Sequence, residues 1–162
     1  MEEIIEVLKK KDIEKVVKMY LLGALEQNPP QQIDEQTIRE LLNDVNIECD
    51  VHKTNGEIDG FITYSGRYIE GKGNIINLDF IYALKKKQSI GKSLILNVAQ
   101  NTLELKVAAI KAIVSMQDPG AIAFYEKLGF KNKGRFEKDN ISLYKVEAEP
   151  HTLLEHIQGV KK

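Results

Sequence analysis

The spacing of apolar and polar residues changes along the chain, and each change predicts a new helix or strand. Residues 4–8 alternate as a first strand does, and apolar residues at helical spacing then predict a helix with Asp12 as its N-cap. Farther along, Asp34 is predicted to cap a second, short helix, with Ile33 and Ile38 forming a hydrophobic staple at its start. Both helices are therefore expected to bury one face.

Strands and helices alternate through the middle of the chain. Three strand-like runs come first, at residues 46–53, 58–64 and 75–84. Asn55-Gly56, between the first two runs, favours a tight hairpin. A helix over 94–105 and a compact apolar strand over 109–115 follow. A helix that joins two strands in this way indicates a parallel crossover.

The last third of the chain predicts one more helix and a hairpin, which make the sheet mixed. The helix covers residues 118–128 and stops at Gly129, a residue suited to the left-handed conformation that ends many helices. Strands over 131–137 and 141–146 are expected to pair across an Asp-Asn turn. Residues 149–162 carry apolar residues at helical spacing, and three interpretations stay open for them: a short packed helix, a dimer arm or a frayed tail.

Length and composition limit the class of protein. A chain of 162 residues suits one domain, expected over residues 1–148, with 149–162 as a C-terminal tail or short helix. The 23 basic and 24 acidic residues nearly balance and are spread along the chain, so the sequence does not favour a nucleic-acid surface. The single cysteine, Cys49, is expected to be a reduced thiol in the core.

The chain shows no sign of export, membrane insertion or metal binding. Its N-terminus is acidic, unlike a signal peptide, and no apolar run approaches the length of a membrane span. His52, His151 and His156 lack the spacing of metal ligands or of a catalytic triad, and each is expected at the surface. These features predict a cytoplasmic protein without metal or membrane contact.

A basic turn between a strand and a helix is the first candidate binding element. The turn, Lys86-Lys87-Gln88-Ser89-Ile90-Gly91-Lys92-Ser93, follows the strand-like run 75–84. Amides at a helix start lack intrahelical partners and the helix dipole adds positive charge there, so a phosphate is stabilised. Gly91-Lys92-Ser93 also matches the tail of a nucleotide-binding P-loop, but that loop requires a glycine where Lys86 stands. A solvated basic turn is the remaining interpretation.

A second signature, DPGAIAFYEKLGF at residues 118–130, follows one strand later. At these two places the chain resembles the GNAT superfamily of acetyl-CoA-dependent N-acetyltransferases, which share Arg/Gln-x-x-Gly-x-Gly/Ala before one helix and Asn-x-x-Ala-x-x-Phe-Tyr-x-Lys-x-Gly-Phe on the next. Gly91 matches the last glycine of the first pattern. Lys86 replaces Arg/Gln, Ser89 replaces the first glycine, and Asp118 replaces Asn.

The resemblance implies a fold, a reaction and a cosubstrate. The fold is α/β, a twisted mixed sheet of about seven strands with splayed central parallel strands and about four flanking helices. The cosubstrate is acetyl-CoA, no metal is required, and an acetyl group passes to a primary amine by direct attack in a ternary complex. The partners are acetyl-CoA and an amine of a small molecule or protein, and a homodimer is an open option.

The resemblance also assigns residues to acetyl-CoA. Backbone amides from Gln88 to Ser93 would hold the pyrophosphate, amides near Ile81 and Ala83 would polarise the acetyl carbonyl, and Tyr125 would protonate the departing thiolate. Asp118 would contact pantetheine, cap a helix, or do both. The complete predicted cofactor-binding set is Ile81, Ala83, Lys86, Lys87, Gln88, Ser89, Ile90, Gly91, Lys92, Ser93, Asp118, Ala121, Phe124 and Tyr125.

The general base and the acceptor are less defined by the sequence. Asp79 is the leading base, because it is ionisable and lies in an otherwise apolar strand that leads to the acetyl site. Glu70, Glu48 and Asp50 are alternatives that would act through water. The acceptor would be gripped by residues 27–32 and 134–144. Two rival functions stay open, a non-catalytic acyl-CoA sensor on the same scaffold and a protein-interaction module without cofactor.

Overall fold

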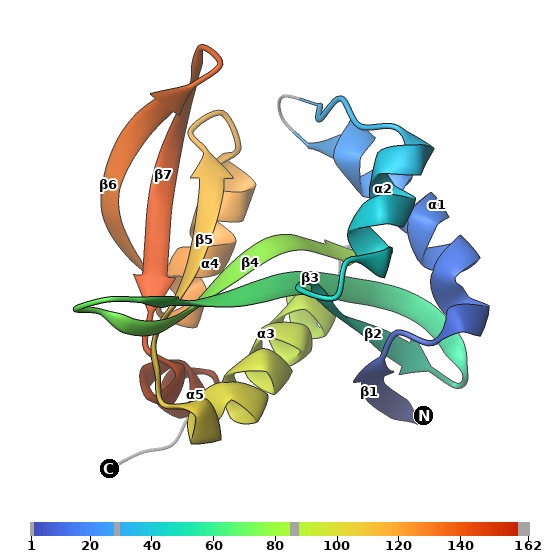
Figure 1. The fold of residues 1–162 in the computed structure, drawn as a ribbon, viewed down its shortest axis with the longest axis horizontal. Coiled ribbons are helices and arrows are strands. Elements are labelled where there is room, and N and C mark those ends of the chain that lie inside the picture. The colour runs from blue at the N-terminus through green and yellow to red at the C-terminus, as the bar shows by residue number, and fades with distance from the viewer. Residues whose placement is uncertain (1, 28–29, 85–87, 159–162) are drawn as a thin grey trace.

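A mixed sheet of seven strands forms the centre of the fold, and the computed structural model describes the chain over residues 2–27, 30–84 and 88–158 (Figure 1). The strands are β1 (Glu3–Val7), β2 (Glu48–Thr54), β3 (Glu57–Ile69), β4 (Gly73–Ala83), β5 (Val107–Ser115), β6 (Lys131–Lys138) and β7 (Ile141–Ala148). Their order is β1-β2-β3-β4-β5-β7-β6, with β4 and β5 parallel and all other neighbours antiparallel. The predicted mixed α/β fold is confirmed.

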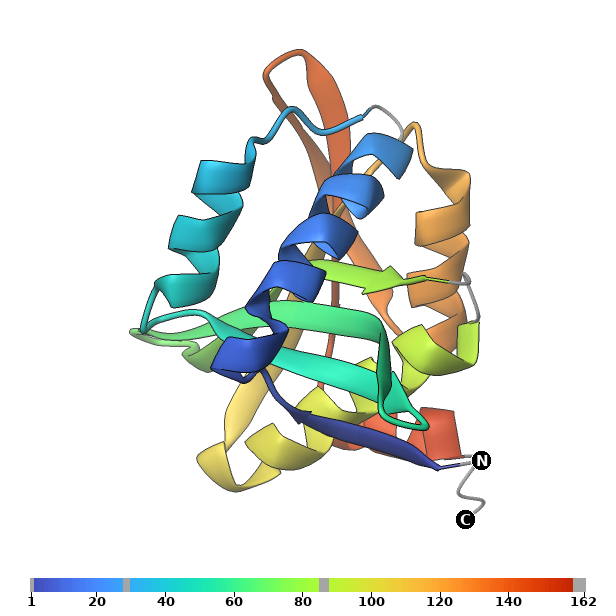
Figure 2. The same ribbon diagram turned by 90° about the vertical axis from the view of Figure 1, so that its right-hand side faces the viewer.

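Five α-helices cover the two faces of this sheet. They are α1 (Ile13–Glu26), α2 (Glu35–Asn43), α3 (Gln88–Thr102), α4 (Pro119–Leu128) and α5 (Pro150–Gln158), with short 3₁₀ turns η1 (Lys10–Asp12) and η2 (Leu103–Leu105). Figures 1 and 2 show α1 and α2 on one face of the β1–β4 half and α3 on the other, while α4 lies beside β5. Helix α5 packs on α3 and buries Leu153, so residues 150–158 form a packed helix.

Each face of the sheet has its own hydrophobic core. Beneath α1, the rings of Tyr20 and Phe80 stack with centroids 4.1 Å apart, and Phe61 lies against both rings. Cys49 belongs to this core as a free, buried thiol, and burial raises its pKa to about 12. Beneath α3, apolar side chains of α3 meet β3, β5 and α5 in a larger cluster. The sheet is therefore packed on both faces.

Helix α1 begins differently from the prediction. Asp12 precedes it, but its side chain makes no capping hydrogen bond, and its backbone is already helical, with φ −100° and ψ −5°. Its carboxylate instead accepts a hydrogen bond from Lys53 Nζ at 3.0 Å, and Glu6 accepts another at 2.8 Å. The predicted side-chain cap is therefore wrong. The Asp12 carboxylate bonds instead to Lys53 of β2, which also bonds to Glu6 and so links η1 to β1.

Helix α2 begins as predicted. Asp34 Oδ1 accepts a hydrogen bond from the Thr37 amide at 2.8 Å, and hydrogen bonds from the Thr37 side chain and, to a smaller extent, this amide hold the pKa of the Asp34 carboxyl below its usual range. Ile38 is fully buried, and Ile33 packs against the same core, which is the arrangement expected for a hydrophobic staple.

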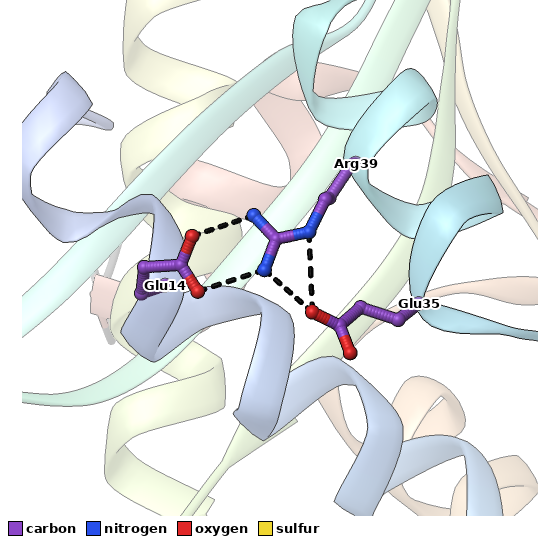
Figure 3. A network of polar contacts seen from close by, with 3 residues as sticks. All are labelled: Glu14, Glu35 and Arg39. Carbon is purple, nitrogen blue, oxygen red and sulfur yellow. Dashed lines mark hydrogen bonds and ion pairs between the residues drawn. The ribbon is translucent and has the colours of Figure 1, made fainter.

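An ion pair joins α2 to α1 (Figure 3). Arg39 donates bidentate hydrogen bonds to the two carboxylate oxygens of Glu14, at 2.6 and 2.7 Å, and also bonds to Glu35 on its own helix. The Arg39 contact holds the pKa of the Glu14 carboxyl below its usual range. An exposed pair of this kind contributes little to the free energy of unfolding.

The predicted turns form, but α3 starts earlier than expected. Asn55 and Gly56 have φ of 51° and 83°, and Asp139 and Asn140 have φ of 53° and 64°, as two-residue hairpin turns of this kind require. Helix α3 begins at Gln88, whereas the pattern placed its start at residue 94. The basic turn is therefore shorter than predicted, because Ile90 is buried and extends the apolar stripe of the helix by one turn.

Replacing Gly129 with alanine is expected to lower the free energy of unfolding by about 1 kcal/mol. Gly129 ends α4 with φ of 108°, a conformation in which a Cβ is strained. Gly120→Ala is the matched control, since a Cβ there meets nothing nearer than Asp118 Oδ1 at 3.6 Å. Denaturant unfolding measures both variants, and equal destabilisation by the two changes would contradict this prediction.

Candidate active site

A β-bulge in β4 opens the middle of the sheet. Two consecutive residues of β3 pair with Phe80 and Leu78 of β4, so Asp79 between them has no partner on β3. The parallel pairing of β4 with β5 ends just before the bulge, at Leu78 and Ala112. Because a bulge bends its strand and increases the local twist, β4 turns away from β5 beyond this point. The ends of the two parallel strands are therefore splayed.

A cleft of about 360 Å³ lies between the splayed strand ends. Its walls come from α1, the ends of β4 and β5, α4 and one residue of α3, and Figure 2 shows α1 and α4 on either side of the end of β4. The cleft gathers many of the predicted site residues from three separate segments of the chain. They are Asp79, Ile81, Ala83, Gly91, Asp118, Ala121, Phe124 and Tyr125.

The open edge of β4 presents backbone amides to the cleft. The Leu84 amide donates to the Asp59 carbonyl of β3 at 2.8 Å. Along a strand, alternate residues direct their N–H and C=O groups to the same side. Leu84 and Tyr82 therefore direct theirs toward β3, whereas Ile81 and Ala83 direct theirs toward the side that β5 has left. Both residues line the cleft, so their N–H groups are donors available to a ligand.

Tyr125 reaches the cleft from α4 with its ring fixed. The side chain is 7% exposed and packs edge-on against Phe124 and Phe130, with ring centroids 5.3 and 5.1 Å away. Across the described parts of the chain, no residue makes a hydrogen bond to the Tyr125 hydroxyl. Burial raises the pKa of this phenol, so the hydroxyl stays protonated and can donate a proton.

Asp79 enters the cleft from the bulge. Asp79 is an exposed residue, but partial burial of its carboxyl raises the pKa of that group, and a hydrogen bond with Ser65 opposes part of the rise. Its charge, together with burial as the larger cause, raises the pKa of Tyr20 on α1 to about 12. Asp79 is therefore close enough to α1 for its charge to act on Tyr20.

Glu26 is a cleft carboxylate that the sequence interpretation did not include. It lines the cleft near the end of α1, and its Oε2 accepts a hydrogen bond from the Tyr82 hydroxyl at 2.6 Å. Burial and this bond raise the pKa of Tyr82 to about 12. No local signal distinguishes Glu26 from the other acidic residues of α1, because its partner lies 56 residues away.

The predicted phosphate-binding residues lie at the start of α3. Gln88, Ser89 and Ile90 form the first turn, where amide groups lack intrahelical acceptors. Gly91 alone among the described residues of α3 lines the cleft, and a Cβ there would lie 3.0 Å from Phe124 Cζ. Lys92 is exposed, and Ser93 Oγ donates to the Ser89 carbonyl at 2.8 Å.

Some predicted groups take no part in the cleft or fall outside the described residues. Lys86 and Lys87 lie outside them. Ser89, Ile90, Lys92 and Ser93 do not line the cleft. Asp118 lines it and also caps α4, because its Oδ1 accepts the Ala121 amide at 3.0 Å.

A comparison with protein families agrees with this geometry. The family model described as an acetyltransferase (GNAT) domain matches residues 7–149. The chain belongs to the GNAT superfamily. No curated protein matched the sequence.

Solved structures share the GNAT fold at low sequence identity. An N-acetyltransferase from Staphylococcus aureus Mu50 is 14% identical, with a TM-score of 0.75 over 93% of this chain and 99% of that one. A ribosomal-protein-alanine N-acetyltransferase from Brucella melitensis is 18% identical, with a TM-score of 0.74 over 90% and 99%. NAA60 of Arabidopsis thaliana, in complex with acetyl-CoA, is 15% identical, with a TM-score of 0.70 over 91% and 98%.

Two polar residues of the GNAT domain, His52 and Asp50, are buried, although the sequence predicted one at the surface and the other as an alternative base. His52 was expected at the surface, but its side chain is 2% exposed, and its Nδ1 lies 2.6 Å from Asp59 Oδ1. That prediction is wrong because the side chain of His52 lies on the face of the sheet that α3 covers. Asp50, on the same face, is hydrogen-bonded by Tyr64 at 3.0 Å and Asn97 at 3.2 Å, and it does not line the cleft.

The remaining alternatives are also outside the cleft. Glu48 and Glu70 are exposed, and neither lines it. Within the described ranges, no cluster of three or more His, Cys, Asp and Glu side chains is placed to hold a metal ion. None of the described helices is long and apolar enough to cross a membrane.

Proposed function

We propose that this GNAT domain transfers the acetyl group of acetyl-CoA to a primary amine by direct attack in a ternary complex. The observation that supports it best is the pairing of two opposed donor sets in one cleft. Backbone amides of Ile81 and Ala83 lie on β4, and the buried Tyr125 hydroxyl enters from α4. The Arabidopsis NAA60 structures contain acetyl-CoA and a bisubstrate analogue, which fits a cleft that receives both substrates.

The proposed reaction uses each donor at a defined atom. The substrate ammonium ion loses one proton to Asp79, directly or through water, and the neutral nitrogen attacks the thioester carbonyl carbon. The Ile81 and Ala83 amides stabilise the oxygen that becomes negative, an interaction stronger in the transition state than in the substrate. As the C–S bond breaks, the thiolate takes the Tyr125 proton, so CoA leaves as a thiol. The second proton of the attacking nitrogen passes to the Tyr125 phenolate, directly or through water, and the proton held by Asp79 is released to water.

The start of α3 is the proposed pyrophosphate site. Its first-turn amides, from Gln88 onward, carry the partial positive charge of a helix N-terminus. Gly91 lets the Phe124 ring approach within 3.0 Å of the position a Cβ would occupy, so the backbone there is close to the cleft. Lys86 and Lys87, directly before the helix in the sequence, would add positive charge to the site.

Acetyl-CoA is expected to raise the melting temperature in a dose-dependent way. Ligand at about a hundred times its dissociation constant should add roughly 2.7 kcal/mol to the free energy of unfolding. Thermal-shift titration measures this, with adenosine alone as the control that lacks pyrophosphate and thioester. A folded sample that shows no shift at millimolar acetyl-CoA would contradict cofactor binding and favour a cofactor-free interaction module.

Thiol release across a panel of amines then tests transfer itself. Acetyl-CoA binding without amine-dependent thiol release would favour the non-catalytic sensor. Release that depends on amine concentration, with the acetylated amine detected by mass spectrometry, is the expected result.

The base role of Asp79 predicts a distinct pH dependence. Burial raises the pKa of this carboxyl, so it binds its proton at higher pH than an ordinary aspartate. Below that pKa the base is protonated, and kcat/KM is expected to fall as pH decreases through a midpoint above the usual aspartate range. Asp79→Asn should lower kcat/KM by about 100-fold and remove this acid limb. An unchanged acid limb in that variant would assign it to another group.

A further inference from the structure

We infer that Gly60 on β3 is a positioning residue for the cofactor site, because its missing side chain lets the start of α3 lie close to the end of β4. The inference rests on the proposed acetyl-CoA site and deepens it. Gly60 is not among the described residues that line the cleft, so its effect on a ligand has to pass through its neighbours. Those neighbours belong to the two elements that carry the proposed donor groups.

Gly60 lies next to both the last residues of β4 and the first turn of α3. It is buried, and it pairs with Ala83 of β4. A Cβ on Gly60 would lie 2.6 Å from Ile90 Cγ2 and 3.1 Å from the Tyr82 carbonyl oxygen. Two carbon atoms attract each other at roughly 3.5–4.0 Å and repel at much shorter distances. Helix α3 can therefore approach β3 this closely only because residue 60 has no side chain.

The Ile90 side chain has little freedom to move aside. It is 4% exposed, and its Cγ2 is bonded directly to Cβ, where a branched side chain in a helix has one strongly preferred rotamer. Leu94, one helical turn later, is fully buried, and its Cδ1 would lie 3.5 Å from the same added Cβ. The space beside Ile90 is therefore filled. A side chain at residue 60 would push the start of α3 away from the sheet.

The spacing of α3 and β4 matters because acetyl-CoA is proposed to bind to both elements at once. The amides of Ile81 and Ala83 are assigned to the acetyl carbonyl, and the first-turn amides of α3 are assigned to the pyrophosphate. The two elements also lie close together at Gly91, where a Cβ would be 3.6 Å from Ile81 Cδ1. The pantetheine arm joins the acetyl group to the pyrophosphate covalently. Moving α3 relative to β4 therefore weakens binding of the whole cofactor even when each donor set is intact.

Gly60→Ala is the variant that tests the inference. The φ of Gly60 lies outside the left-handed region that favours glycine, so alanine adds only a steric contact. We expect the dissociation constant of acetyl-CoA to rise by at least about tenfold, measured by isothermal titration at a temperature where the protein is folded. ADP, which has a pyrophosphate but no pantetheine, and S-acetylpantetheine, which has the thioester but no pyrophosphate, should each bind within about threefold of the parent value.

A second substitution shows whether the effect passes through Ile90. Leucine has a volume similar to that of isoleucine but only one Cγ, so Ile90→Leu removes the atom that the new alanine methyl would meet. In the double variant Gly60→Ala/Ile90→Leu, acetyl-CoA is expected to bind at least about threefold more tightly than in Gly60→Ala. This comparison stays decisive where a fragment binds too weakly to be measured.

Gly66→Ala is the matched control on the same strand. Gly66 is exposed, and a Cβ there would lie 3.2 Å from Ile76 Cδ1, the far end of a flexible side chain. This variant should bind acetyl-CoA as the parent does. Circular dichroism and the melting temperature confirm that each variant is folded.

The outcomes separate this inference from the proposed function. Unchanged acetyl-CoA affinity in Gly60→Ala would overturn the inference and leave acetyl transfer intact. Equal losses for acetyl-CoA and both fragments would also overturn it, as would a double variant that binds no better than Gly60→Ala. A loss confined to the intact cofactor, in a protein whose parent transfers no acetyl group to any amine, would retain the inference and overturn the transferase function. A parent protein that binds no acetyl-CoA would overturn both.

Discussion

Tyr125→Phe is expected to lower the turnover number by about 100-fold, while the melting temperature and the affinity for acetyl-CoA change little. The substitution keeps the ring, and the ring makes the edge-on contacts with Phe124 and Phe130. It removes only the hydroxyl, which has no hydrogen-bond partner among the described residues. No buried partner is therefore left unsatisfied, and stability has little reason to fall.

The rate loss follows from the protonation state of the phenol. Burial raises the pKa of Tyr125, so the group is neutral at the pH of the assay and able to donate to a departing thiolate. An interaction made only in the transition state lowers kcat and kcat/KM together, and steady-state kinetics with a reactive amine measure both. Tyr68→Phe, at a 70% exposed position on β3, controls for loss of a phenol elsewhere. Turnover within about threefold of the parent would make water the proton donor and Tyr125 a packing residue.

Gly91→Glu is expected to weaken acetyl-CoA binding by at least about tenfold, equivalent to about 1.4 kcal/mol. The first turns of α3 attract an anion, and a carboxylate there opposes the pyrophosphate. The structure adds a steric term, because the Cβ of any residue at this position would lie 3.0 Å from Phe124 Cζ and 3.6 Å from Ile81 Cδ1. Part of the effect therefore comes from displacement of Phe124, which lines the cleft.

Two further variants separate the part of the affinity loss that comes from the added charge from the part that comes from the added side-chain volume. Gly91→Ala introduces the Cβ alone and is expected to reduce affinity only slightly, since Phe124 has to move by a few tenths of an ångström. Gly91→Gln matches glutamate in size without its charge. Isothermal titration with acetyl-CoA measures all three variants. Equal losses for glutamate and glutamine would place the pyrophosphate elsewhere, and unchanged affinity in all three would remove α3 from the cofactor site.

Where a local interaction decides the structure, the sequence alone was sufficient to predict it. Asp34 caps α2 through an amide three residues away, and Asn55-Gly56 turns because both residues tolerate positive φ. Gly129 ends α4 for the same reason. The alternation of strand and helix patterns predicted the mixed sheet, since burial of one face imposes a fixed period on each element.

Local patterns were insufficient where a distant partner changes the role of a residue. Asp12 lies at a helix start but bonds to Lys53, which is 41 residues away. His52 looked like a surface histidine, but the pairing of β2 within the sheet buries it beside Asp59. The early start of α3 at Gln88 follows from burial of Ile90, which packs close to Gly60 of β3.

The residues of the candidate site also divide into those that the sequence predicted and those that only the tertiary structure revealed. The two sequence signatures showed a resemblance to the GNAT superfamily, and that resemblance named residues on α3, α4 and β4; residue order by itself showed only the helix start with its free backbone amides. The cleft itself depends on Asp79 having no partner on β3, which becomes evident only when β3 and β4 are aligned in register. Glu26 enters the cleft because α1 crosses β4 and Tyr82 holds it there. Strand register and helix placement are set by burial across the whole sheet, so only the tertiary structure decided which carboxylates line the cleft.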